Sequence, residues 1–314
     1  PAIVVKSAGA TLRDPVWSYR FHALVGFTDD GRLAETTNLL GPGQAVSRLS
    51  APMDVGRNLQ ISQKDDRHVF VPQPRHGKVA VIDLATLSQV DEFDAGPAPA
   101  YLAQDPGMRV LLALSADGSS VTPVDEYGFR KLPTAAVTGE RADSVSGANR
   151  GREIDYRLYG PSGIRYYKGP SSPPEELGSL AMDVAAAAGD GTAVTRSYVA
   201  RRDDDTLYAV GSKPGGKGLQ VLAATRLPSP IRRIVTDDTR IYAATDRELV
   251  VLETDSVTGY SHHTIPLLRV INYRAGLPQA VQSAPLSGMA VGPTRVYLTF
   301  VGAPWVVGVA KPHL

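Results

Sequence analysis

The chain has 314 residues, of which 43% are hydrophobic and 21% are charged, and it contains no cysteine. This composition predicts a globular, soluble protein with a large core, and it excludes disulfides, thiolate zinc sites and cysteine nucleophiles. The net charge of +1 argues against a nucleic-acid-binding surface, which needs clustered positive charge. No apolar run approaches the roughly 20 residues that span a bilayer.

Strands are predicted throughout the chain, and many of them belong to a repeating pattern. Early strands are expected at Ala2–Val5, Phe21–Phe27 and Arg32–Asn38. Arg67–Gly96 then combines an apolar strand, a polar turn and a second strand that ends near an acidic residue. The same order of elements returns at Arg109–Leu132 and Arg240–Gly259. Internal repetition on this scale is typical of arrays, solenoids and propellers.

Alignment of the repeats on one apolar strand gives the length of the unit. Ile82 and Val124 take equivalent positions 42 residues apart. Equivalent positions further along the chain are Leu222, Leu252 and Val309. One more unit precedes Ile82, and another falls between Val124 and Leu222, with strands expected at Ile154–Tyr159 and Ile164–Lys168. Seven units with a mean length of about 45 residues fit the four-stranded blades of a propeller.

We therefore predict a single all-β domain over residues 1–314, a seven-bladed β-propeller of four-stranded antiparallel blades. Strands that are apolar on both faces, such as Lys78–Leu84, are expected because each sheet is covered by its neighbours. Ala2–Val5 is expected to complete the last blade beside Val306–Ala310, which removes an exposed edge. Three stretches that interrupt the rhythm are expected to be loop insertions, near residues 138–152, 169–188 and 261–287. The second of them offers a short helix at Leu180–Ala188.

Lys64–Gly96, with the sequence KDDRHVFVPQPRHGKVAVIDLATLSQVDEFDAG, resembles the YVTN-type β-propeller repeat. In that family an Asp-Gly turn precedes a strand like RVYVAN, and a hairpin leads to VSVID and a closing strand that ends in Gly. Partial matches follow at Ile231–Gly259 and Leu286–Lys311. The resemblance implies a propeller fold and an extracytoplasmic location in bacteria. Relatives include surface-layer proteins, lipid-anchored proteins, lactonase-like enzymes and quinoprotein-type domains.

No residue set predicts catalysis, a cofactor or a metal. Gly211–Gly218, GSKPGGKG, approaches a phosphate-binding loop, but Gly218 stands where a magnesium-binding Ser or Thr is needed, and a strand follows instead of a helix. His262 and His263 are adjacent, so on a strand they would point to opposite faces. Asp203–Asp205 lacks the alternating ligands and the distal Glu of a calcium loop. We expect a glycine-rich hairpin, surface histidines and an aspartate turn at these places.

A binding face is predicted from the geometry of antiparallel blades, because the turns between second and third strands all lie at one end of the ring. These turns are expected at Gln73–Gly77, Ser115–Ser119, Gly211–Gly218 and Thr245–Arg247. They carry seven charged or titratable side chains, which we predict to bind a partner: Arg75, His76, Asp117, Lys213, Lys217, Asp246 and Arg247. A solvated rim without a ligand is the alternative.

The leading hypothesis for function is a non-enzymatic binding or scaffolding propeller outside the cytoplasm. It would be periplasmic, cell-surface or secreted, as a bacterial cell-envelope protein or as the mature domain of a lipoprotein whose N-terminus has been removed. We expect a protein or another envelope component as the partner, no nucleic acid and no cofactor; the channel also offers room for a small ligand. The alternative is a lactonase-like or quinoprotein-type enzyme, which needs acidic or histidine side chains converging at the channel mouth. A purely structural envelope protein is the third hypothesis.

Overall fold

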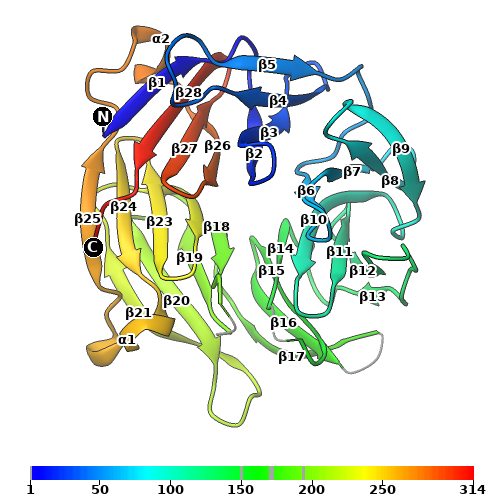
Figure 1. The fold of residues 1–314 in the computed structure, drawn as a ribbon. Helices are drawn as coiled ribbons and strands as arrows, with labels where there is room; N and C mark the ends of the chain where they lie inside the picture. Colours follow the sequence, from blue (N-terminus) through cyan, green and yellow to red (C-terminus); the bar gives the residue numbers. More distant parts are fainter. Residues whose placement is uncertain (1, 149–150, 170–172, 193–194) are drawn as a thin grey trace.

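The computed structural model describes residues 2–148, 151–169, 173–192 and 195–314. These residues form seven four-stranded antiparallel sheets, which stand as blades around a central channel (Figure 1). The predicted seven-bladed propeller is therefore confirmed. Within each blade we name the strands a to d from the channel outward.

The four strands of each blade follow one another along the chain, except in the last blade. Blade 1 has β2 (Arg13–Ser18), β3 (Ala23–Phe27), β4 (Leu33–Thr37) and β5 (Val46–Leu49); blade 2 has β6 (Gln60–Ile61), β7 (His68–Gln73), β8 (Lys78–Asp83) and β9 (Ser88–Phe93); blade 3 has β10 (Pro99–Asp105), β11 (Val110–Ser115), β12 (Ser120–Asp125) and β13 (Ala135–Ala136); blade 4 has β14 (Ser144–Gly147), β15 (Ile154–Gly160), β16 (Gly163–Gly169) and β17 (Glu175–Leu180).

The remaining blades complete the ring and carry the few helical turns. Blade 5 has β18 (Val184–Gly189), β19 (Ser197–Arg201), β20 (Thr206–Ser212) and β21 (Leu219–Arg226); blade 6 has β22 (Ile231–Thr236), β23 (Arg240–Thr245), β24 (Glu248–Glu253) and β25 (Leu267–Asn272); blade 7 has β26 (Leu286–Val291), β27 (Arg295–Phe300), β28 (Ala303–Ala310) and β1 (Ile3–Ser7). The helical turns are α1 (Asp255–Thr258), the 3-10 turn η1 (Ser261–His263) and α2 (Gln279–Gln282). Among the described residues, no helix is long and apolar enough to cross a membrane.

The ring is closed by strands from the two ends of the chain. β1 pairs antiparallel with β28, with Ile3 opposite Val309 and Val5 opposite Val307, and the two strands lie side by side in Figure 1. This pairing confirms the predicted closure. Because β28 would otherwise present an unpaired row of backbone groups, β1 supplies the hydrogen bonds that the last blade needs.

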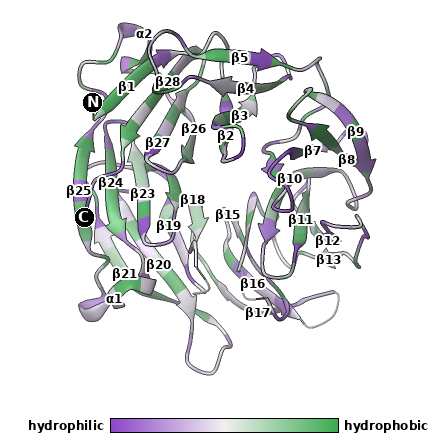
Figure 2. Ribbon diagram, viewed as in Figure 1, coloured by the Kyte–Doolittle hydropathy of each residue, from purple (hydrophilic) through white to green (hydrophobic). Residues whose placement is uncertain are grey.

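The core is distributed between the blades. The described residues form seven clusters of buried apolar side chains, one at each of the seven interfaces between neighbouring blades. At the first interface, Val25 and Leu33 of blade 1 pack with Val69 and Ile82 of blade 2. Hydrophobic residues therefore run along the strands, and hydrophilic residues gather in the turns and on outer strands such as β9 (Figure 2). The two-sided apolarity expected of Lys78–Leu84 is confirmed, since β8 is buried from Val79 to Asp83.

Two predicted elements are wrong in blade 5. Leu222 lies in β21, the outermost strand, whereas the other aligned positions lie in third strands; the third strand of blade 5 is β20. The apolar alternation of Leu219, Val221 and Ala223 in β21 matches that of a more interior strand, which explains the error. Leu180–Ala188 forms no helix: β18 within it is the innermost strand of the blade. Tertiary pairing overrides the helical preference of alanine here.

The three expected loop insertions contain strands. The stretch near 138–152 contains β14, that near 169–188 contains most of β17 and β18, and that near 261–287 contains β25. Residues 149–150 and 170–172 of these stretches lie outside the described residues. β14 is short, β17 is largely polar and β18 is alanine-rich, so these three strands lack the apolar repeat signal.

The channel wall is formed by innermost strands that pack closely against one another. Gly147 of β14 packs against β10, and a Cβ at position 147 would lie 2.1 Å from the carbonyl oxygen of Gln104. Gly288 of β26 packs against β2 in the same way, since a Cβ there would lie 2.3 Å from Cδ of Pro15. Only glycine fits at these two positions without moving the neighbouring backbone or proline ring.

Gly147→Ala is expected to destabilise the protein, because the added methyl group meets a backbone carbonyl that cannot move alone. The expected loss is on the order of 1–3 kcal/mol of unfolding free energy, measured by urea denaturation. Gly128→Ala is the matched control, since its Cβ would meet only a side-chain oxygen at 3.5 Å; it should stay within about 0.5 kcal/mol. Equal effects from the two substitutions would contradict the close-approach explanation.

Candidate binding site at the channel mouth

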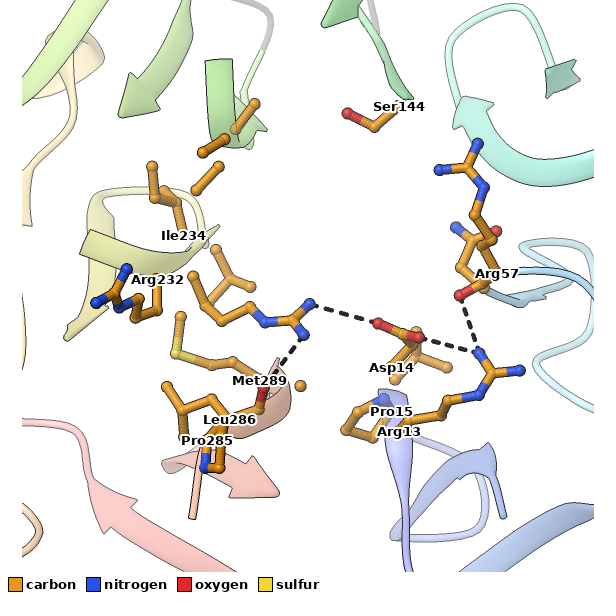
Figure 3. Close-up of a pocket in the computed structure, with 18 of the residues that line it drawn as sticks. Arg13, Asp14, Pro15, Arg57, Ser144, Arg232, Ile234, Pro285, Leu286 and Met289 are labelled. Atoms are coloured by element: carbon orange, nitrogen blue, oxygen red, sulfur yellow. Dashed lines mark hydrogen bonds and ion pairs between the residues drawn. The ribbon is translucent and has the colours of Figure 1, made fainter. Parts of the chain in front are cut away.

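A cavity of about 1290 Å³ opens at one end of the channel, and innermost strands from all seven blades line it (Figure 3). The lining comes from the first residues of these strands and from the connections that lead into them, such as Gly56–Gln60 before and within β6. The b–c turns and the d–a connections share this end of the ring. We call this end the mouth face, and the end with the a–b and c–d turns the opposite face.

Arginine dominates the charge of the cavity lining. Among the residues that the structure describes, six arginines and three aspartates line it, and no lysine, histidine or glutamate does so. The whole chain carries a net charge of only +1, so positive charge is concentrated at the mouth. The arginines are Arg13, Arg57, Arg232, Arg233, Arg247 and Arg274, and the aspartates are Asp14, Asp143 and Asp246.

Asp14 links blades 1 and 6 across the mouth. Its carboxylate lies 3.1 Å from Nη1 of Arg13 and 3.5 Å from Nη1 of Arg233, as the dashed lines in Figure 3 show. Arg233 belongs to β22 in blade 6, and it reaches past blade 7 to make this contact. Asp14 has a φ of 48°, a left-handed conformation that aspartate tolerates better than most residues do. The irregular start of β2 thus directs the carboxylate toward both guanidinium groups.

Arg232 and Arg57 are held in different ways. The guanidinium of Arg232 pairs with Asp203 at 2.8 Å and with Asp246 at 3.2 Å, so its charge is compensated by two carboxylates. Arg57 lies 5.2 Å from the ring centroid of Tyr101 and donates a hydrogen bond to the backbone carbonyl of Asp143. Burial in the channel wall raises the pKa of Tyr101 to about 12, against the opposing effect of Arg57. The Tyr101 phenol therefore stays protonated at neutral pH.

Arg274 has a structural role behind the mouth. It is only 9% exposed, and it donates hydrogen bonds to the carbonyls of Asp246, Val281 and Ala284 at 2.5–2.7 Å. Its guanidinium also lies 4.9 Å from the ring centroid of Phe300. These contacts tie the connection that carries α2 to the b–c turn of blade 6. Arg274 thereby fixes the turn that presents Arg247.

Five of the seven predicted site residues lie in b–c turns on the mouth face. Asp246 and Arg247 line the cavity itself. Arg75 and His76 form a turn whose backbone amides bond to Asp54 at 2.9 and 3.3 Å. Asp117 accepts hydrogen bonds from Ser115 and Ser119 within its own turn. The structure thus places all five residues at one end of the channel, but only Asp246 and Arg247 line the cavity.

Lys213 and Lys217 were assigned to the wrong end of the ring. They lie in the turn between β20 and β21, a c–d turn, and therefore on the opposite face. The misaligned Leu222 produced this error, since it moved the blade 5 register by one strand. Four arginines that line the cavity were not predicted from the sequence: Arg13, Arg57, Arg232 and Arg233. Arg13, Arg232 and Arg233 lie near the start of innermost strands, in pairs of charged residues. Such pairs interrupt the apolar pattern, so these strands give little repeat signal.

The other sequence motifs form no ligand site in the described part of the chain. No group of three or more His, Asp or Glu side chains there is arranged to hold a metal ion. Gly211–Gly218 spans the end of β20 and a turn into β21, as a hairpin rather than a phosphate-binding loop. His262 and His263 lie in η1 and are exposed. Asp204 accepts a hydrogen bond from the backbone amide of Thr206, which is the expected aspartate turn.

No protein-family profile and no curated protein sequence matches this chain, but solved structures match its fold. A chain of a mitotic checkpoint complex has a TM-score of 0.70 at 12% identity, covering 98% of this chain and 94% of that one. The RRP9 WD40 repeats have a TM-score of 0.71 at 12% identity, covering 98% and 97%. A chain of Kuenenia stuttgartiensis hydrazine synthase has a TM-score of 0.65 at 10% identity, covering 96% of each chain. The chain is a seven-bladed β-propeller that resembles WD40-type propellers, and these identities show the fold alone.

One buried carboxyl lies away from the mouth. Glu126 follows β12, in a turn on the opposite face, and is 3% exposed. Burial raises the pKa of Glu126 to about 7; the neighbouring charge of Asp125 adds to the rise, and Gln63 opposes it. The folded state binds the Glu126 proton more tightly than the unfolded chain does. The protonated carboxyl therefore contributes fully to the stability of the fold below pH 4.5. The contribution is lost as the pH rises to about 7.

Glu126→Gln is expected to remove this pH-dependent loss. The unfolding free energy of the parent chain should fall between pH 4.5 and about pH 8 because Glu126 ionises. The variant lacks this fall, so at about pH 8 its stability relative to the parent should be on the order of 2–3 kcal/mol higher than at pH 4.5. Urea denaturation at both pH values measures the difference. The exposed Glu92 provides the control, since Glu92→Gln should leave the pH dependence of the parent chain unchanged. A Glu126→Gln variant with the parent's pH dependence would contradict the raised pKa.

Proposed function

We propose that this propeller is a non-enzymatic binding or scaffolding module whose partner docks on the mouth face. The observation that carries the proposal is the wide cavity at the mouth, whose rim is built from loops and strand ends of several blades. Loops held by a rigid scaffold are the usual carriers of binding function. The likeness to a chain of a mitotic checkpoint complex, an assembly of proteins by its name, supports a role in protein binding by analogy of fold.

The charges at the mouth support binding over catalysis. An enzyme site of the lactonase or quinoprotein type needs several acidic or histidine side chains converging from different blades. The cavity lining instead carries twice as many arginines as aspartates. Asp14 is held by Arg13 and Arg233, and Asp246 is held by Arg232. Carboxylates engaged in such ion pairs are poor candidates for proton transfer.

The proposal includes an extracytoplasmic location and YVTN-type repeats. Its support is the resemblance of Lys64–Gly96 to that repeat, which covers β7, β8 and β9 of blade 2. We propose a bacterial cell-envelope protein or the mature domain of a lipoprotein. Fractionation of cells that express the full gene product tests the location, and recovery in the cytosolic fraction would contradict it.

Replacement of two exposed cations on the mouth face is expected to weaken partner capture without unfolding the protein. The test variant is Arg75→Gln with Arg247→Gln, and both side chains are exposed. Capture of envelope proteins by the immobilised propeller, quantified by mass spectrometry, should fall about tenfold for the specific partner. Circular dichroism and the melting temperature should stay unchanged.

Lys213→Gln with Lys217→Gln is the matched control, because it removes the same charge from exposed positions on the opposite face. Capture by this variant should equal that of the parent chain. Equal loss with both variants would indicate a non-specific charge effect, and no loss with either would place the partner elsewhere. Both results would overturn the mouth face as the docking surface.

A further inference from the structure

Some guanidinium groups of the mouth are weakly paired within the described part of the chain. Arg13 and Arg233 share the single carboxylate of Asp14. Arg233 makes two long contacts, 3.5 Å to Asp14 and 3.4 Å to the carbonyl of Leu286. Charge-assisted hydrogen bonds between guanidinium and carboxylate normally measure about 2.7–2.9 Å. The planar guanidinium of Arg233 can therefore donate shorter hydrogen bonds to an anionic partner that approaches more closely.

Two further arginines carry charge that no carboxylate balances in the described part of the chain. Arg57 makes its hydrogen bond to a backbone carbonyl and its other contact to an aromatic ring. Figure 3 shows Arg57 on the wall opposite Arg232, with its guanidinium directed along the cavity. Arg247 is exposed in the b–c turn of blade 6, and no ion pair of its guanidinium is present among the described residues. Because Arg57 and Arg247 come from opposite sides of the ring, an anionic ligand in the mouth meets donors on both sides.

The walls between these arginines strengthen the attraction. Val16, Ala186 and Val235 line the cavity and are partly exposed to it. Where the wall is apolar it offers no water or polar groups to screen the guanidinium groups, so their field is screened less there than on an open surface. The concave shape also raises the local concentration of anions. A carboxylate is thus attracted more strongly to these arginines inside the mouth than it would be to the same arginines on a convex surface.

Size and rim charge indicate what kind of anion fits. The cavity of about 1290 Å³ exceeds the roughly 300–1,000 Å³ of typical small-molecule pockets, which favours a chain segment over a small anion. Asp117 and Asp203 stand exposed or nearly so in b–c turns around the mouth. They would repel the continuous phosphate backbone of a nucleic acid. A peptide with discrete carboxylates can instead place them between these aspartates.

We propose that the mouth binds a partner protein through an acidic peptide segment, whose Asp or Glu carboxylates pair with Arg57, Arg233 and Arg247. This inference rests on the proposed binding function and adds the chemistry of the partner. The segment enters the channel mouth in an extended form, and its carboxylates displace the long contact between Arg233 and Asp14.

A labelled octaglutamate peptide tests the inference with the purified chain. By fluorescence anisotropy, octaglutamate should bind, octaglutamine should not, and the dissociation constant should rise at least about tenfold between about 50 mM and about 300 mM NaCl. The variant Arg57→Gln with Arg247→Gln should weaken binding about tenfold or more. The control Lys213→Gln with Lys217→Gln should change it less than about twofold. Thermal melts of both variants confirm that they are folded.

Several results would overturn the acidic-segment inference. They are the absence of octaglutamate binding at about 1 mM peptide, equal loss with the mouth and control variants, equal binding of octaglutamine, and tighter binding of an oligothymidylate of the same charge. The reversed variant Arg57→Glu with Arg247→Glu should bind octalysine in preference to octaglutamate, and failure to do so counts against it as well. A chain that ignores octaglutamate but loses its envelope partner on replacement of Arg75 and Arg247 keeps the proposed binding function and loses only the acidic segment.

Discussion

Face-to-face packing of apolar sheets is the interaction on which the rest of this structure depends. No blade buries both of its faces alone, and each of the seven core clusters is shared by two neighbours. Burial of a Val, Leu or Ile side chain contributes about 1.5–3 kcal/mol relative to exposure, so an open ring would expose two complete apolar faces. The pairing of β1 with β28 matters for this reason, since it holds the last blade in place between its neighbours.

This packing also determines where function can reside. The faces of the blades are buried in the core, and the outer strands form the outside of the ring. The turns and the channel are therefore the places where a binding site can lie. The innermost strands converge, and contacts such as Gly147 against Gln104 and Gly288 against Pro15 bring their backbones together. Where the strands begin, they separate enough to leave the cavity at the mouth. Asp14 shows the consequence, because a left-handed residue at the start of β2 joins Arg13 to an arginine two blades away.

The sequence predicted the parts of this architecture that depend on burial, and it failed where burial is weak. Val79, Ala80, Val81 and Ile82 are apolar on both faces because two neighbours cover β8, so the pattern itself reveals the sandwiched blade. The pairing of β1 with β28 was predicted on a different ground, the need to cover the exposed edge of the last blade. The inner strand β18 is built from alanines, whose preference favours a helix, and only its neighbours β19 and β22 make it a strand. In β21 an alternating apolar pattern on an outer strand displaced the register of blade 5, and it carried Lys213 and Lys217 to the wrong end of the ring.

The candidate site was harder to predict than the fold because it is assembled by the ring rather than by any one repeat. Arg57, Arg233 and Arg247 are separated by up to 190 positions in the sequence, and no local spacing relates them. Each occupies an ordinary place within its own blade, in a connection, at the start of a strand or in a turn. Only closure of the propeller brings their charges to one opening, where two guanidinium groups share the carboxylate of Asp14. The excess of arginine over aspartate at the mouth is therefore a property of the closed ring, although the whole chain has a net charge of only +1.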